Sequence, residues 1–471
     1  MFIATRRSLL AGAVLLAVAV IAGPATAQDA ALPAPMQARI DSAARDVLAR
    51  TGAPSASIAV VRGGRLVYAS AYGSARLDPP MGATPAMRYS IGSISKQFTA
   101  AAILLLAERG KLSLNDKVSR WLPDLTRANE VTVRQVLSMT SGYQDFWPQD
   151  YVMPPMLKST TARQIVNDWA HKPLDFEPGT RWQYSNTNYV IAGLIIEKAS
   201  GMPLVSFLRK EILTPLHMES VMITDDAGLG PTDPERYLRY ALGPLRPAPK
   251  EGRGWMFAAG ELAMTASDLA RWDISVIDQT VLKPSSYLVQ QTAVLLNNGV
   301  STGYGLGVQV GMANGHRVIA HSGEVSGFTG QNSIYPDDST AVVVLTNLDA
   351  TGASGQIAGR IADLLFGATD RATQAAVAQA RAIFAGLQHG TIDRSLFSDN
   401  ANAYFSDQAI ADFASSLGPL GPPADVTQTS QSLRGGMTFR AFRIRCGQKV
   451  VSLTTFTLPD GKLEQYQIAS Q

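Results

Sequence analysis

A serine and a lysine stand three residues apart, at Ser93 and Lys96, where an apolar segment begins. Side chains with this spacing lie on one face of a helix, so the hydroxyl and the amine can meet. A serine hydroxyl needs a nearby base at neutral pH, and a lysine whose pKa is lowered by burial can be that base. The alternative is a capping serine followed by a surface lysine. This Ser-x-x-Lys is the only one in the chain, and apolar Ile94 and Phe98 adjoin it, which favours catalysis.

Two further segments carry polar groups suited to acyl transfer. Tyr184 and Asn186 precede a second apolar helix; a tyrosine hydroxyl can relay protons, and an asparagine amide can bind a lysine and a substrate carbonyl. Alone, this pair would be interpreted as a turn followed by a helix cap. His321, Ser322 and Gly323 follow a predicted strand, where a glycine allows substrate to approach the backbone.

The order and spacing of these motifs resemble the serine β-lactamase and penicillin-recognising enzyme family. The Tyr-x-Asn form is similar to that of class C β-lactamases, related DD-peptidases and D-aminopeptidases, and carboxylesterases with a β-lactamase fold. The resemblance covers about residues 36–366 and includes Leu137–Tyr143, Phe176–Gly179 and Gly260–Leu269.

The resemblance implies a role for each matched residue. Ser93 would be the acylated nucleophile, and Lys96 and Tyr184 would share the work of the general base, with the choice between them left open. Asn186 would orient Lys96 and bind the substrate amide. The backbone N–H groups of Ser93 and Glu324 would form the oxyanion hole. The chain has no Gly-x-Ser-x-Gly, which disfavours the nucleophile elbow of α/β-hydrolases.

The third motif departs from class C β-lactamases, which have a lysine where His321 stands. The resemblance places His321, Ser322 and Gly323 at the substrate. Histidine titrates near pH 6.5 when unperturbed, so we expect carboxylated substrates to bind better as pH falls. Efficient β-lactam hydrolysis is not expected.

The composition is that of a globular protein with two or three domains: 471 residues, 46% hydrophobic and 17% charged. The net charge of +3 gives no electrostatic argument for nucleic acid. The single cysteine, Cys446, excludes an internal disulfide and is predicted to be a buried thiol. The five histidines show no metal-binding spacing, so we expect no metal and no cofactor.

Residues 1–27 have the pattern of an export signal. Arg6 and Arg7 precede an apolar run, and Ala25-Thr26-Ala27 is a small-x-small cleavage site. The apolar run is too short for a stable membrane span. We expect a periplasmic or secreted protein, exported by either an ordinary or a twin-arginine signal.

The predicted elements form an α/β (α+β type) fold, in which strands from both ends of residues 36–366 make one antiparallel sheet flanked by helices. A helical lobe inserted between them would leave a cleft, where small-molecule sites usually lie. The elements are helices at 36–50, 96–109, 161–170, 189–199, 267–277 and 356–366, and strands at 57–61, 65–71, 317–320, 331–335 and 341–346.

A change of character after residue 366 predicts a second domain. Residues 367–375 read as a linker, and 376–471 as an accessory α+β domain whose helices precede four alternating segments. Binding, dimer contact and packing are all open roles for this domain; we expect packing or dimer contact first, with the oligomeric state open.

Together, the motifs predict an exported serine hydrolase acting through an acyl-enzyme on Ser93. Its substrate would be a small molecule or peptide: a D-amino-acid peptide, a short ester or a β-lactam. The alternative is a peptidoglycan- or ligand-binding protein of the same fold with little turnover.

Overall fold

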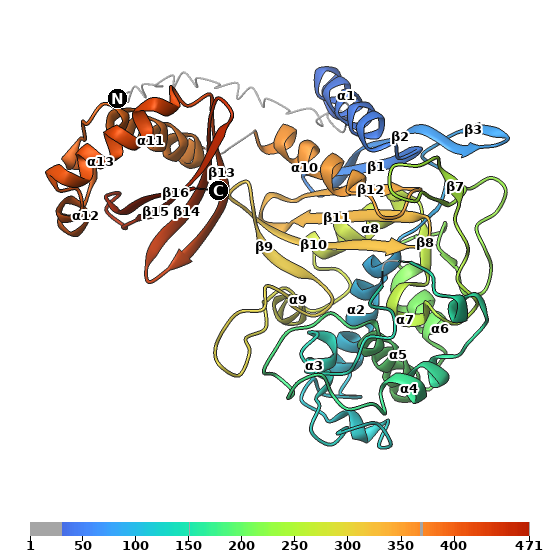
Figure 1. The fold of residues 1–471 in the computed structure, drawn as a ribbon. Coiled ribbons are helices and arrows are strands. Elements are labelled where there is room, and N and C mark those ends of the chain that lie inside the picture. The colour runs from blue at the N-terminus through green and yellow to red at the C-terminus, as the bar shows by residue number, and fades with distance from the viewer. Residues whose placement is uncertain (1–30, 150, 368–370, 471) are drawn as a thin grey trace, which may run out of the picture.

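The computed structural model describes residues 31–149, 151–367 and 371–470. Its first part is built on a seven-stranded sheet in the order β3-β2-β1-β12-β11-β10-β9 (Figure 1). All six pairings are antiparallel, and β1 joins β12, as expected for strands from the two ends of this part. The strands are β1 (Ser55–Arg62), β2 (Arg65–Leu77), β3 (Pro80–Gly82), β9 (Gln309–Ala313), β10 (His316–Val325), β11 (Phe328–Tyr335) and β12 (Thr340–Thr346).

Helices cover both faces of this sheet. Side chains of α1 (Ala34–Thr51) and α10 (Ala353–Phe366) share one apolar core with Ile58 and Val60 of β1. The alternate residues Ala59 and Val61 face the other core. This alternation follows from the two-residue period of a strand, and it explains why all but one residue of β1 is buried.

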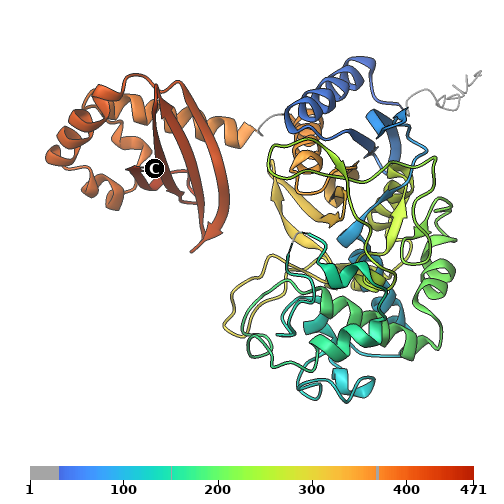
Figure 2. The same ribbon diagram turned by 45° about the vertical axis from the view of Figure 1, so that its right-hand side comes forward.

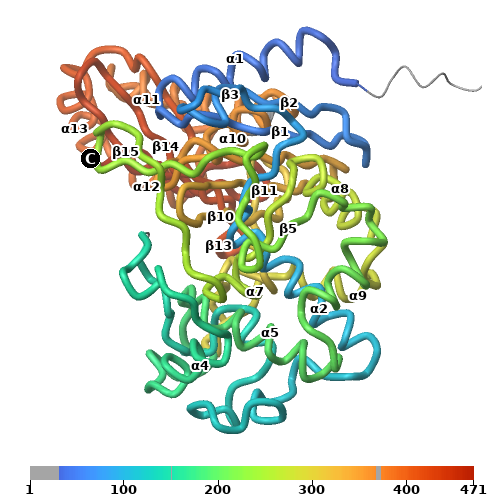
Figure 3. Tube along the Cα trace, turned by 90° about the vertical axis from the view of Figure 1, so that its right-hand side faces the viewer, coloured from blue at the N-terminus to red at the C-terminus, as the bar shows by residue number. Residues whose placement is uncertain are grey.

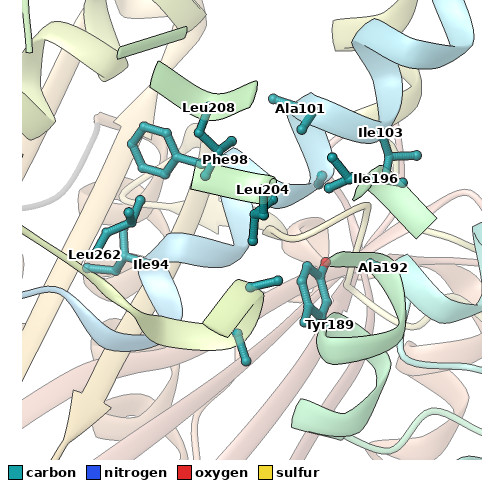
Figure 4. Packing of buried hydrophobic residues seen from close by; sticks show 14 of the residues in the cluster. Ile94, Phe98, Ala101, Ile103, Tyr189, Ala192, Ile196, Leu204, Leu208 and Leu262 are labelled. Atoms are coloured by element: carbon teal, nitrogen blue, oxygen red, sulfur yellow. The ribbon is translucent and has the colours of Figure 1, made fainter. Parts of the chain in front are cut away.

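The second core is shared with the helical lobe, which lies below the sheet in Figure 3. Helix α2 is buried from Lys96 to Leu106, as expected for a helix that is apolar all round. Figure 4 shows Phe98 of α2 in this core together with Tyr189 and Ile196 of α5. The helices are α2 (Lys96–Glu108), α3 (Val133–Leu137), α4 (Ala162–Trp169), α5 (Asn186–Ser200), α6 (Leu204–Leu208), α7 (Phe257–Gly260), α8 (Ala266–Ile277) and α9 (Pro284–Gln290).

The structure extends two sequence-based predictions. Strand β10 pairs with β11 as far as Val325, so His321 and Gly323 lie within the strand and not after it. The lobe predicted as mainly helical also contains short strands: β4 (Tyr89–Ser90), β5 (Met222–Ile223) and β8 (Leu262–Met264) form one sheet, and β6 (Tyr237–Leu238) pairs with β7 (Arg246–Pro247). The Thr265 side chain caps α8, because it accepts a hydrogen bond from the Asp268 N–H.

A buried acid–amide pair fastens α8 to the sheet. The Asn332 Nδ2 donates to Asp273 Oδ1 at 2.8 Å, and both residues are fully buried. The other oxygens of the pair, Asp273 Oδ2 and Asn332 Oδ1, have no partner. Burial raises the pKa of Asp273 well above its usual range. If Asp273 is protonated, one hydrogen can serve both atoms, because Asp273 Oδ2 can then donate and Asn332 Oδ1 can accept.

The C-terminal part packs its helices on one face of a four-stranded antiparallel sheet (Figure 2). Cys446 is buried in this core as a free thiol, as predicted. Helix α11 begins at Arg371, inside the predicted linker, because that segment is rich in helix-forming alanine. The elements are α11 (Arg371–Gln388), α12 (Asp399–Tyr404), α13 (Asp407–Leu417), β13 (Asp425–Arg434), β14 (Met437–Cys446), β15 (Lys449–Thr457) and β16 (Leu463–Ser470).

Candidate active site

A pocket of about 600 Å³ lies where the edge of the sheet meets the helical lobe. The sequence motifs supply its lining from three separate elements. Ser93 comes from the turn η2 (Gly92–Ser95) before α2, Tyr184 and Asn186 come from the start of α5, and His321 and Ser322 come from β10. The structure therefore brings the three predicted motifs to one pocket.

Two glycines allow the turn that carries Ser93 to pack against β10. Gly92 has a φ of +51°, and a Cβ there would lie 2.9 Å from the Glu324 nitrogen. A Cβ on Gly323 would lie 1.9 Å from the Ile91 carbonyl oxygen, which no side chain tolerates. This close approach is the structural reason for glycine in the His-x-Gly motif. It places the backbones of Ser93 and Glu324 at the same pocket.

The free edge of β10 forms one wall of this pocket. Strand β9 pairs with β10 only from His316 to Ala320. Beyond Ala320, the part of β10 with Ser322 and Glu324 continues past its partner on that side. An extended substrate can therefore form backbone hydrogen bonds along this edge, as a peptide does when it adds to a sheet.

Lys96 is fully buried, and its Nζ contacts three oxygen atoms. Its Nζ lies 2.9 Å from Ser93 Oγ, 2.8 Å from Asn186 Oδ1 and 2.8 Å from the Ala259 carbonyl oxygen. Burial lowers the pKa of Lys96 to about 7, against an opposing effect of Asp145. A neutral amine has two hydrogens and one lone pair. Because the amide and carbonyl oxygens can only accept, they take both hydrogens, and the lone pair is left for the Ser93 hydroxyl.

Tyr184 completes the group around the nucleophile. Its ring centroid lies 5.0 Å from Lys96 Nζ. Burial raises the pKa of Tyr184 well above its usual value, against a hydrogen bond with Ser93 that lowers it. The phenol is therefore protonated at neutral pH and can donate a proton, while Lys96 is the group that can take one.

Asp145 holds Asn186 in place, a role that the sequence did not reveal. Its Oδ1 accepts the Asn186 backbone N–H at 2.8 Å, and its Oδ2 accepts Asn186 Nδ2 at 3.3 Å. This fixes the amide with its oxygen toward Lys96. Burial raises the pKa of Asp145. The only sequence signal was its position two residues after the family-like segment that ends at Tyr143.

His321 is neutral, contrary to the expected titration near pH 6.5. Its Nδ1 lies 2.6 Å from the Ser322 carbonyl oxygen, which can only accept, so Nδ1 carries the proton. The Tyr304 hydroxyl then donates to Nε2 at 2.9 Å. Burial, with Lys96 nearby, lowers the pKa of His321 to about 4. Better binding of carboxylates between pH 8 and pH 5 is therefore no longer expected from this residue.

Tyr304 was not predicted as a site residue. Between Gly303 and Gly305 it reads as part of a turn, and only the pairing of β9 with β10 brings it to His321. The pocket walls were missed for the same reason, since they come from loops. They carry four aromatic residues, Phe146, Trp147, Tyr151 and Trp182, and the carboxylate of Asp349. Glu324, which was predicted only for its backbone N–H, adds a second carboxylate from β10.

No group of three or more histidine, cysteine, aspartate or glutamate residues in the described ranges could hold a metal ion. Within the same ranges, no single helix is long and apolar enough to cross a membrane. One bent pair, Asn186–Ser200 with Leu204–Leu213, meets that test by length and composition only.

Comparisons with known proteins show which family this chain resembles. Residues 40–365 match the family described as Beta-lactamase. Penicillin-binding protein 4* of Bacillus subtilis (strain 168) is 29% identical over 309 residues, which are 62% of this chain and 67% of that protein. Protein flp of Staphylococcus aureus (strain MRSA252) is 29% identical over 67% of this chain and 63% of its own length. The chain thus spans about two thirds of these relatives.

Solved structures show the same fold. A D-stereospecific amidohydrolase from Streptomyces sp. has a TM-score of 0.61 and 26% identity, over 71% of this chain and 99% of its own. The D-amino acid amidase from Ochrobactrum anthropi SV3 complexed with D-phenylalanine has a TM-score of 0.65 and 23% identity, over 71% and 100%. The octameric penicillin-binding protein homologue from Pyrococcus abyssi has a TM-score of 0.63 and 21% identity, over 92% and 99%.

Proposed function

The chain belongs to the Beta-lactamase family of serine hydrolases, and we propose that it is an exported member that cleaves amide or ester bonds through an acyl-enzyme on Ser93. The observation that carries this proposal is the buried Lys96, whose Nζ lies 2.9 Å from the Ser93 hydroxyl oxygen. A lysine with only a structural role would normally lie at the surface. Lys96 is instead enclosed beside Ser93 by a turn, a strand and a helix. The geometry therefore favours catalysis over binding without turnover.

The proposed reaction has two halves. In the first, Ser93 Oγ attacks the substrate carbonyl while Lys96 takes its proton, and the N–H groups of Ser93 and Glu324 bind the oxyanion. Tyr184, whose phenol is protonated, passes a proton to the leaving amine or alcohol, and Lys96 restores it. In the second half, water attacks the ester on Ser93 by the reverse sequence of proton transfers, and the acid product leaves.

The substrates we propose are D-aminoacyl amides and peptides or short esters. The support is the similarity to proteins named as a D-stereospecific amidohydrolase and a D-amino acid amidase. The neutral His321 supports the same choice, because it offers no cation to the carboxylate of a β-lactam.

Export to the periplasm or the medium is proposed from residues 1–27, which lie outside the described part of the chain. Cell fractionation of the protein with and without Arg6→Lys and Arg7→Lys tests this. Loss of export in the double variant supports the twin-arginine route. Accumulation of the unaltered protein in the cytoplasm contradicts export.

The C-terminal domain is proposed to serve packing or dimer contact. Sedimentation velocity of the full chain over a range of concentrations tests the dimer. If the chain stays monomeric up to about 100 μM, the free energy of dimerisation is weaker than roughly −5 kcal/mol. Packing then remains as the proposed role of the C-terminal domain.

The catalytic proposal is tested by covalent labelling. A fluorophosphonate probe should add to the protein at Ser93, and Ser93→Ala should abolish both labelling and hydrolysis while the unfolding temperature stays unchanged. The matched control is Ser159→Ala, which removes an exposed hydroxyl outside the pocket. Labelling that persists in Ser93→Ala, or that is absent from the unaltered protein, contradicts the proposal.

A further inference from the structure

The charged side chains that line the pocket are all acidic. They are Asp145, Glu324 and Asp349, and among the described residues no lysine or arginine joins them in the lining. Lys96 lies behind Ser93 and is already half neutral at pH 7. A substrate carboxylate in this pocket would therefore meet like charges and no fixed cation, which is unfavourable in a partly desolvated site.

Glu324 and Asp349 are held side by side at the end of the sheet. The Ala350 N–H donates to Glu324 Oε1 at 2.7 Å, and the Gly327 N–H donates to Asp349 Oδ2 at 3.2 Å. Each carboxylate thus accepts a backbone N–H from the segment that carries the other. Burial raises the pKa of Asp349, and backbone hydrogen bonds oppose this shift.

Asp145 is committed to positioning Asn186. Both of its oxygens accept hydrogen bonds from Asn186, and one also accepts the Trp147 N–H at 3.2 Å. The other two carboxylates in the lining are those of Glu324 and Asp349. The N–H of Glu324 also faces the proposed oxyanion. A positive charge bound by these two carboxylates would lie in the same pocket as Ser93.

Among the described residues that line the pocket, His321 is the one whose side chain could carry a positive charge. Both of its ring nitrogens are already hydrogen-bonded within the protein. Protonation of Nε2 would require the Tyr304 hydroxyl to stop donating. The neutral state of His321 is thus a consequence of its two fixed partners as well as of its burial.

We propose that this pocket selects substrates with a free ammonium group on the acyl side of the scissile bond, bound by Asp349 together with Glu324. This proposal rests on the proposed acyl-enzyme function and names its substrate class: aminoacyl amides, esters and peptides with an unblocked α-amino group. The α-nitrogen of such a substrate is two bonds from the carbonyl carbon, which matches a carboxylate on the oxyanion-hole residue. The aromatic walls at Trp147 and Trp182 suit an apolar side chain and a nearby cation.

The test compares three substrates that share one leaving group. They are phenylalanine p-nitroanilide, its N-acetyl derivative and its N-succinyl derivative, each as both enantiomers, at pH 6.5, where the α-amino group is charged. The unaltered protein should prefer the amino substrate to the acetyl substrate at least tenfold in kcat/KM. The succinyl substrate, which carries a carboxylate, should be the poorest.

Asp349→Asn tests the assigned residue. It removes the charge and keeps the oxygen that accepts the Gly327 N–H, so the ratio of amino to acetyl kcat/KM should fall about tenfold, mainly through KM. Asp349→Glu, which restores the charge, should recover part of the ratio. The acetyl substrate measured on the same variant controls for damage to the fold.

Two results would overturn the inference. One is an unaltered protein that cleaves the acetyl or succinyl substrate as well as the amino substrate, which can be measured without any variant. The other is an unchanged ratio in Asp349→Asn. Either result leaves the acyl-enzyme proposal standing, since hydrolysis at Ser93 is still observed. Failure of the proposed function has a different signature, because no substrate and no fluorophosphonate probe would then react.

Discussion

The rate of acylation should follow the ionisation of Lys96. Burial lowers its pKa to about 7 from 10.5, a shift that corresponds to roughly 5 kcal/mol in favour of the neutral amine. Only the neutral amine can accept the Ser93 proton. With this pKa, about half of the protein is active at pH 7, about one tenth at pH 6 and about one hundredth at pH 5. We expect a tenfold loss per pH unit below 7 and a plateau above 8.

The assay is the burst of p-nitrophenol from a neutral p-nitrophenyl ester, followed by stopped flow between pH 5 and pH 9. A neutral ester removes ionisation of the substrate from the profile. His321 lies outside this window because its pKa is about 4. Glu261 lies inside it, since burial raises its pKa to about 8. The variant Glu261→Gln should keep the rising limb, and Lys96→Ala should lose it together with most of the rate.

Three outcomes would refute this reasoning. A midpoint above pH 9 would mean that Lys96 titrates like a solvated lysine and is charged during turnover. A profile that stays flat from pH 5 to pH 9 would mean that no group titrating in this range takes the proton. If the rising limb disappears in Glu261→Gln and survives in Lys96→Ala, the limb reports the ionisation of Glu261 and not that of Lys96.

Further changes near the site have distinct expected effects. Tyr184→Phe should lower kcat on amide substrates by a larger factor than it changes KM. Full activity of this variant on an anilide would show that Tyr184 takes no part in proton transfer. Tyr304→Phe should leave His321 Nε2 buried without a donor, lowering the free energy of unfolding by about 1–3 kcal/mol and shifting the ¹⁵N resonance of Nε2; unchanged values would contradict the hydrogen bond. Asp273→Asn should be more stable than the unaltered protein at pH 7.5, as measured by urea unfolding. The raised pKa of Asp273 favours folding fully only below its unfolded value of 3.8, so the difference should shrink toward pH 4; a difference independent of pH would contradict a buried neutral acid.

The sequence predicted the parts of the fold that depend on local periodicity. The apolar helix at Lys96 is found with its end within one residue of the prediction, and the antiparallel sheet that joins both ends of the first part is confirmed. The motif residues Ser93, Tyr184 and His321 were found because residue type and spacing carry their chemistry. Their predicted convergence in one pocket is what the geometry shows.

The charge of the pocket could not be predicted, because it depends on contacts between distant segments. Asp349 reaches the site through the pairing of β12 with β11, and Tyr304 reaches His321 through the turn before β9. Nothing in the local sequence of either residue distinguishes it from a loop residue. The expected titration of His321 was wrong for the same reason, since an unperturbed pKa assumes solvent that burial excludes.

The burial that forms the core of the helical lobe also sets the chemistry of the site. Ile94 and Phe98, which identified the helix in the sequence, are fully buried beside Lys96, and it is this burial that lowers the pKa of the amine. The unfolded state binds one more proton than the folded state between pH 7 and 10.5, so folding is favoured increasingly as pH rises through that range. At pH 7 the protein therefore forgoes stability of several kcal/mol, on the order of one core side chain, to keep a base beside Ser93. Strongly shifted pKa values cluster at functional sites, where a base with a pKa near 7 is needed.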